Sequence, residues 1–243
     1  MDPTTGTMPA TSAPAPMGLF ARLFGVIFSP YQAYAAVAAR PRWFGALAIG
    51  TLLTCAALFW MYSSEGVQRA TLEQQVSVLE GFGVTVTDEA YDQMESRMAW
   101  SPYTTAASVL FGAPFVNALL AGLLLGVFNA IMGGNATFRQ VFAIVSHAGF
   151  VSAVAQVISA PINYAREQIT SPMRLNALLP MFDEESAVGM FLGSIDLFIV
   201  WWLLSLAIGV GVLYKRRTGP IMTGFLGVFL AIVAVVTGIR LAF

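Results

Sequence analysis

Charged residues are scarce in this chain. They make up 10% of its 243 residues, whereas a soluble domain carries about 25%. Hydrophobic residues make up 57%, and the mean hydropathy is +0.73. This composition excludes a disordered chain, most soluble enzymes and a nucleic-acid binder with a basic surface. It indicates an integral membrane protein whose first partner is the lipid bilayer.

Cysteine and histidine are almost missing, which excludes several kinds of chemistry. The single cysteine, Cys55, can form neither an intramolecular disulfide nor a cysteine metal site. The single histidine, His147, excludes an HExxH motif and any histidine-rich metal site. The sequence has no GxSxG elbow, Walker loop or GxGxxG turn. We therefore expect no metal, no cofactor and no enzymatic activity, with an intramembrane hydrolase of unfamiliar design as the alternative.

Long apolar runs predict the fold. A helix of about 20 apolar residues crosses a bilayer core of about 30 Å. The sequence predicts an all-α integral membrane bundle of five transmembrane helices, at 44–62, 103–132, 139–160, 188–214 and 220–241. Pro114 gives the second helix a reason to bend, Pro161 is expected to stop the third, and Pro220 suits the first turn of the fifth.

The residues before the first span divide into a tail and two short helices. Residues 1–17 are rich in Pro, Thr, Ser and Ala, which predicts a disordered tail. Residues 18–42 predict cytoplasmic interfacial helices, because each run is too short to cross the bilayer. They read as plain anchors or, alternatively, as a docking surface for a partner. The side chains expected to point into lipid are Leu19, Phe20, Leu23, Phe24 and Phe28.

The loop 63–100 predicts an extracytoplasmic helical hairpin within the five-span domain 43–243. Apolar residues recur at helical spacing from Val67 to Leu79, with Glu and Gln between them. Gly81 and Gly83 break this helix, and Thr87 can cap the next one. Acidic residues gather here, either as a solvated helix surface, which we favour, or as a site that attracts cations.

Lysine and arginine predict the orientation. With the N-terminus inside, the cytoplasmic segments hold only Asp2 as an acid, whereas the opposite side holds the run 183–185 and most other acids. Short cytoplasmic connections rich in Lys and Arg indicate the N-terminus inside and the C-terminus outside. The basic residues on the cytoplasmic side are Arg22, Arg40, Arg42, Arg139, Lys215, Arg216 and Arg217.

Four segments, taken in order, resemble one family. S-P-Y at 29–31 is followed by A-R-P-R-W-F at 39–44. GGNATFRQVFAIVSHAG at 133–149 and I-D-L-F-I-V-W at 195–201 complete the pattern. Together they resemble bacterial Yip-domain proteins over about residues 28–240. The resemblance implies five spans and a cytoplasmic N-terminus.

One departure from the family pattern concerns partners. The resemblance implies that eukaryotic members bind Rab/Ypt GTPases through a long N-terminal region with a D-L-Y-G-P-like motif. Here the corresponding stretch, 28–31, is short and reads F-S-P-Y. Rab-type GTPase binding is therefore not expected. The Ala- and Gly-rich composition and the short tail are typical of a bacterial protein, which predicts an inner-membrane location.

Asp196 and His147 are the ionisable residues predicted inside the membrane. Each stands eight residues into its span, about 12 Å along the helix at 1.5 Å per residue. Because the two helices run antiparallel, we expect the side chains to meet directly or through one water. The pair is either a proton relay or an interhelical contact, and we favour the contact.

Further polar and small residues belong to the predicted bundle interior. The polar candidates are Asn117, Asn129 and Gln156, together with Trp201 of the fourth-span motif. Two GxxxG pairs predict close helix packing inside the bundle, with dimerisation as the alternative. These glycines are Gly122, Gly126, Gly189 and Gly193.

The function expected from the sequence is a non-enzymatic Yip-type scaffold or accessory protein that acts through membrane partners, lipids or a second copy. The alternative is a small transporter or an ion- or proton-conducting protein that uses Asp196 and His147.

Overall fold

The structure is a computed structural model that describes residues 17–179, 181–183 and 186–242. The predicted tail, except for Met17, lies outside these residues. The described residues form helices and no β-strands, which confirms an all-α membrane bundle. The helices are α1 (Leu19–Phe28), α2 (Pro30–Ala39), α3 (Phe44–Tyr62), α4 (Glu65–Gly81), α5 (Asp88–Met98), α6 (Ser101–Leu125), η1 (Gly126–Ile131), α7 (Phe138–Arg166), α8 (Leu175–Leu178), α9 (Ala187–Gly193), α10 (Leu197–Leu213) and α11 (Thr218–Ala242).

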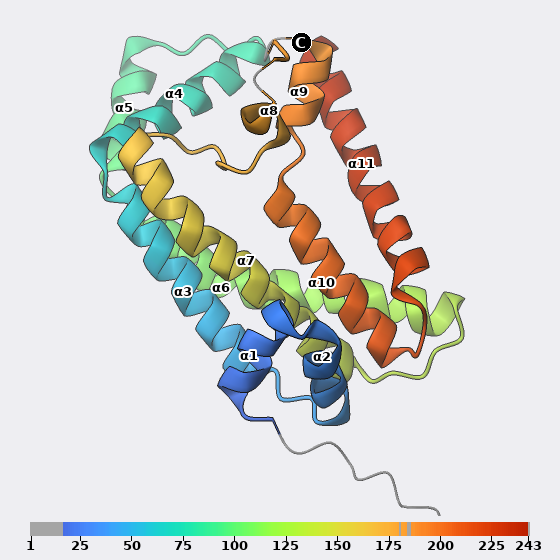
Figure 1. The fold of residues 1–243 in the computed structure, drawn as a ribbon. Helices are drawn as coiled ribbons and strands as arrows, with labels where there is room; N and C mark the ends of the chain where they lie inside the picture. Colours follow the sequence, from blue (N-terminus) through green and yellow to red (C-terminus); the bar gives the residue numbers. More distant parts are fainter. Residues whose placement is uncertain (1–16, 180, 184–185, 243) are drawn as a thin grey trace, which may run out of the picture.

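Helix α7 is the centre of the bundle. In its most apolar window 67% of the residues are buried, against 11–28% for the other long apolar helices. Figure 1 shows α7 between α3 and α10, and α6, α1 and α2 also contact it. In a membrane an apolar helix can be covered either by lipid or by other helices, and α7 is covered by helices. The buried stretch Val141–Ala148 marks where that covering is complete.

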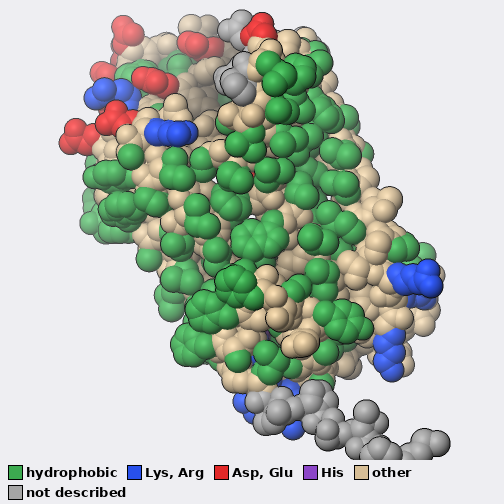
Figure 2. Space-filling view, viewed as in Figure 1, with side chains coloured by type: hydrophobic (Ala, Val, Ile, Leu, Met, Phe, Trp, Pro, Cys, Tyr) green, Lys and Arg blue, Asp and Glu red, His purple; other side chains and the backbone are tan. Residues whose placement is uncertain are grey.

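The helices are long and apolar enough for a multi-pass membrane protein. Helices α3, α7 and α11, together with the continuous stretch Ser101–Ile131, can each cross a bilayer by length and composition. The end of α11 lies at the opposite end of the bundle from α1 and α2 (Figure 1). Figure 2 shows a hydrophobic belt between an end where acidic side chains gather and an end where basic side chains lie.

Two of the predicted span boundaries are wrong. Helix α7 does not stop at Pro161 but continues to Arg166 and ends at Glu167, whose φ is 52°. A proline costs the helix one backbone hydrogen bond, and membrane helices tolerate this loss where neighbouring groups compensate. The predicted fourth span is not one helix, since α9 ends at Gly193 and α10 begins at Leu197.

The two N-terminal helices pack on the bundle more tightly than interfacial anchors would. The expectation that Leu23 faces lipid is wrong, because it is buried against Ala46 and Phe150. Phe20, Phe24 and Phe28 are exposed, as expected. In α2, Ala33, Tyr34 and Val37 are fully buried.

Tyr34 joins α2 to the bundle. Its hydroxyl forms a buried hydrogen bond with Ser205 Oγ of α10, with 2.7 Å between the oxygens. Gly209 lets α10 approach, because a Cβ there would lie 2.5 Å from Ile144 Cγ2 and 2.9 Å from Tyr34 Cε1. Helix α2 therefore closes the basic end of the bundle.

The hairpin of α4 and α5 has the predicted helical form. Helix α4 ends at Gly81, Gly83 takes a φ of 78°, and α5 begins after Thr87. The Thr87 hydroxyl accepts the Ala90 N–H, as the capping prediction required.

The prediction that GxxxG glycines bring helices together inside the bundle is wrong for the second span. A Cβ at Gly122 or Gly126 would meet nothing within 4 Å, since both residues are exposed. Gly193 approaches Asn176 of the short helix α8 instead of a long helix. Gly189 is buried in α9.

Removal of the buried Tyr34–Ser205 hydrogen bond tests the docking of α2. We expect Tyr34→Phe to lower the free energy of unfolding by about 0.6–2 kcal/mol, as for interhelical hydrogen bonds in membranes. Tyr34→Ala, which also leaves a cavity, is expected to cost about 3–5 kcal/mol. The measurement is SDS titration in bicelles, with the exposed Tyr31→Phe as control. Equal stability of the Tyr34 variants and the control would contradict the docking.

Candidate functional site

The break between α9 and α10 is the main irregularity of the bundle. Its backbone pairs with the segment after α7: Leu175 N–H donates to Ile195 O, and Leu197 N–H donates to Met173 O, both at 3.0 Å. Irregular backbone at membrane depth needs such partners, because lipid supplies none. With 17 residues, α10 rises about 25 Å, so the break lies near one edge of a bilayer core of about 30 Å.

Asp196 starts α10. Its Oδ1 accepts the Phe198 N–H at 2.7 Å, which makes it the N-cap of the helix. The positive end of the helix dipole also favours a carboxylate at this position. The expectation that Asp196 lies within a helix, eight residues into a span, is therefore wrong.

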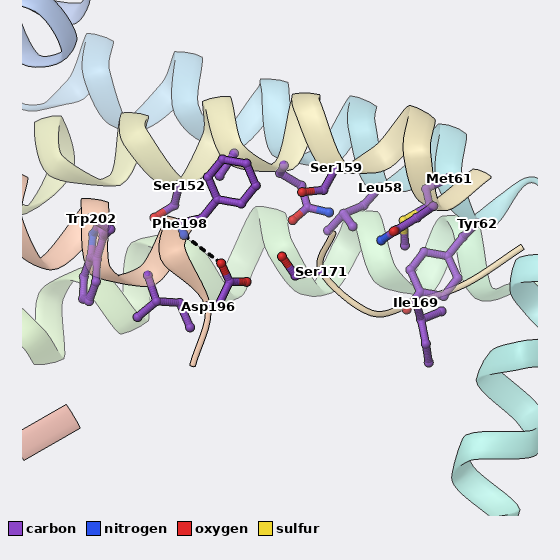
Figure 3. A pocket seen from close by; sticks show the side chains of 14 residues that line it. Leu58, Met61, Tyr62, Ser152, Ser159, Ile169, Ser171, Asp196, Phe198 and Trp202 are labelled. Carbon is purple, nitrogen blue, oxygen red and sulfur yellow. Dashed lines mark hydrogen bonds between the residues drawn. The ribbon is translucent and has the colours of Figure 1, made fainter. Parts of the chain in front are cut away.

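A polar cavity of about 310 Å³ opens beside Asp196. Figure 3 shows the carboxylate in the space between α7 and the loop that carries Ser171. Helix α7 contributes polar side chains at spacings of four, three and four residues, which places them on one face. These side chains are Ser152, Gln156, Ser159 and Asn163.

The chemistry of this cavity suits binding. Asp196 is the one carboxylate among its lining residues, and hydroxyl and amide groups surround it. Carboxylate, carbonyl and hydroxyl oxygens are ligands for hard cations and for small polar solutes. Among the described residues no group of three or more His, Cys, Asp or Glu side chains is placed to hold a metal ion.

His147 does not form the predicted hydrogen bond with Asp196. The His147 side chain is fully buried. Its Nδ1 is hydrogen-bonded to Ala143 O of its own helix at 2.7 Å, and its Nε2 has no hydrogen-bond partner among the described residues. Asp196 lies instead opposite the C-terminal half of α7, from Ser152 to Asn163. The predicted direct contact between His147 and Asp196 is wrong, because the break places Asp196 at the start of α10.

The other polar candidates are divided among different places. Gln156 lines the cavity beside Asp196, whereas Asn117 lines a separate space of about 620 Å³ between α3, α6 and α7. Asn129 exchanges two hydrogen bonds with the backbone of Ala136 and fixes the turn before α7. Trp201 packs half-buried against the core, and its neighbour Trp202 lines the cavity.

Sequence reasoning missed the polar face of α7. The residues at 152, 156, 159 and 163 follow helical spacing, which was a readable signal. The expected stop at Pro161 hid it, because Asn163 then fell outside the span.

A comparison with protein families matches the Yip1 domain over residues 24–239, from within α1 to within α11. The chain belongs to the Yip1 domain family. It is therefore a multi-pass membrane protein of the Yip type. The match covers α2, the central helix α7 and every residue that lines the Asp196 cavity. Comparisons with curated proteins and with solved structures give no match.

The capping role of Asp196 predicts different effects for two substitutions. Asp196→Ala is expected to lower the free energy of unfolding by about 0.5–2 kcal/mol, because Ala cannot accept the Phe198 N–H. Asp196→Asn is expected to change it little, since Asn caps as well as Asp. SDS titration in bicelles measures both. If Asn costs as much as Ala, the charge and not the cap stabilises this helix start.

Proposed function

We propose that this Yip-type protein is a non-enzymatic organising or scaffold protein, which acts through membrane partners or lipids. The observation that carries the proposal is the layer of α1 and α2 packed at the basic end of the bundle. This layer is fixed on its inner side and presents apolar side chains on its outer side.

Arg22 fixes the inner side of α1. It is 4% exposed, its Nε donates to Met17 O, and its Nη1 donates to Arg40 O, both at 3.1 Å. Burial, together with the nearby charges of Arg42 and Arg40, lowers the pKa of the Arg22 guanidinium. The buried guanidinium and its two hydrogen bonds orient α1. The opposite face of this helix carries Phe20, Phe24 and Phe28.

The outer side of the layer suits contact with a lipid surface or a membrane protein. Phe20, Phe24 and Phe28 are 66%, 57% and 78% exposed, and Tyr31 of α2 is 67% exposed. Large aromatic side chains are common at protein interfaces and at membrane interfaces. Rab-type GTPases stay outside the proposal, because residues 28–31 read F-S-P-Y and not the D-L-Y-G-P-like motif that the family resemblance links to GTPase binding.

Photo-crosslinking in native membranes tests the scaffold proposal. With a photoreactive residue at Phe24, we expect one recurrent protein partner in stoichiometric amount. The same group at Val84, which is exposed in the turn between α4 and α5, is the matched control and should not capture that partner. Identical captures at both positions, or recovery of the chain alone, would contradict a scaffold for another protein.

We further propose a bacterial inner-membrane location with the α1–α2 end in the cytoplasm and the C-terminus outside. Basic connections at one end and acids at the other support this orientation. In a Cys55→Ser background, an impermeant maleimide applied to intact cells should label Ser96→Cys of α5. It should leave Ser29→Cys unlabelled until the cells are opened. The reverse pattern would contradict the orientation.

The Asp196 cavity supports a second candidate function, transport of a small polar solute or cation. The packing disfavours it, because Val141–Ala148 and Tyr34 are buried between the cavity and the basic end of the bundle. Proteoliposome flux with Asp196→Asn distinguishes the two functions. Flux that this folded variant abolishes would support transport, whereas an unchanged partner at Phe24 would support the scaffold.

A further inference from the structure

An apolar groove lies on the outside of the bundle. One wall is formed by the end of α6 and by η1, and the other by α10 and α11. Its volume is about 880 Å³, within the range of about 300–1,000 Å³ that ligand pockets take. Figure 1 shows η1 reaching past α10 toward the start of α11. The walls are apolar: Leu123 and Val228, on opposite sides, are 65% and 63% exposed.

Two arginines stand at one end of this groove, in the turn between α10 and α11. Arg216 Nη2 donates to Met132 O at 2.9 Å, which holds its guanidinium at the end of η1. Arg217 is exposed and lines the same end. The groove therefore combines an apolar channel with a cationic mouth.

We propose that this groove binds one anionic phospholipid, with an acyl chain between α6 and α11 and the headgroup phosphate at Arg216 and Arg217. Guanidinium groups bind phosphate oxygens through charge-assisted hydrogen bonds. Basic pockets between membrane helices on the cytoplasmic side are a recurrent form of lipid headgroup site.

The positive charge of the two arginines makes a second copy of the chain an unsuitable occupant of the groove. A helix of another copy would cover both arginines, and a buried charge needs a partner of opposite sign. The acidic side chains of the described residues lie in α4, in α5 and between α7 and α9, at the opposite end of the bundle (Figure 1), or, as Asp196, beside the polar cavity. An anionic headgroup supplies the missing charge.

This inference uses a surface separate from the α1–α2 layer, so either proposal can fail without the other. Native mass spectrometry of the full chain in detergent gives the affinities of dioleoyl-phosphatidylglycerol and dioleoyl-phosphatidylcholine. We expect the phosphatidylglycerol adduct to be about tenfold tighter, as one hydrogen-bonded charge allows. Arg217→Gln should remove this preference, and Arg42→Gln, an equal charge change at the same end, should preserve it.

A second matched pair tests the apolar channel. Gly224 lines the groove and Gly227 does not, and a Cβ at either position meets nothing within 4 Å. Gly224→Leu should weaken both lipids about tenfold, and Gly227→Leu should leave both unchanged. Equal affinities for the two lipids, or equal effects of Arg217→Gln and Arg42→Gln, would overturn the proposal. A dimer that Gly224→Leu dissociates would overturn it as well, by assigning the groove to a second copy.

Discussion

The burial of α7 from Val141 to Ala148 is the constraint on which the rest of the structure depends. Because lipid tails are as apolar as the helices, the neighbours of this stretch are held by close packing and by interhelical hydrogen bonds. Helices α3, α6 and α10 supply most of the cover, and α1 and α2 complete it near the basic end. The close approach at Gly209 is a consequence, because it admits both Ile144 and the ring of Tyr34.

Two features border α10, a polar pocket and an apolar groove. At the acidic end α10 begins only at Leu197, and the polar face of α7 from Ser152 to Asn163 lines the cavity beside this helix start. The interrupted backbone is satisfied by the segment 173–175 and by the Asp196 cap. At the basic end the turn with Arg216 and Arg217 borders an open apolar groove. Ile199 and Trp202 of α10 line both the polar pocket and the apolar groove.

Much of this fold is predictable from the sequence because bilayer physics acts locally. The length of the apolar runs predicts the long helices, and Gly81, Gly83 and Thr87 predict the hairpin. The break before α10 depends on pairing with a distant segment, so no local pattern marks it. Docking of α2 likewise depends on a hydrogen bond between residues 171 positions apart. Pro161 misled the interpretation, since its effect depends on whether neighbours compensate for the lost bond.

The cover of α7 near the basic end is complete only if α2 is part of the packed core and is not a helix free in the interface. Hydrogen–deuterium exchange of the full chain in lipid nanodiscs measures this directly. We predict that Ala33–Val37 exchanges as slowly as Val141–Val151 of α7, while the exposed helix α5 exchanges much faster. Fast exchange of Ala33–Val37, comparable to that of α5, would contradict the account.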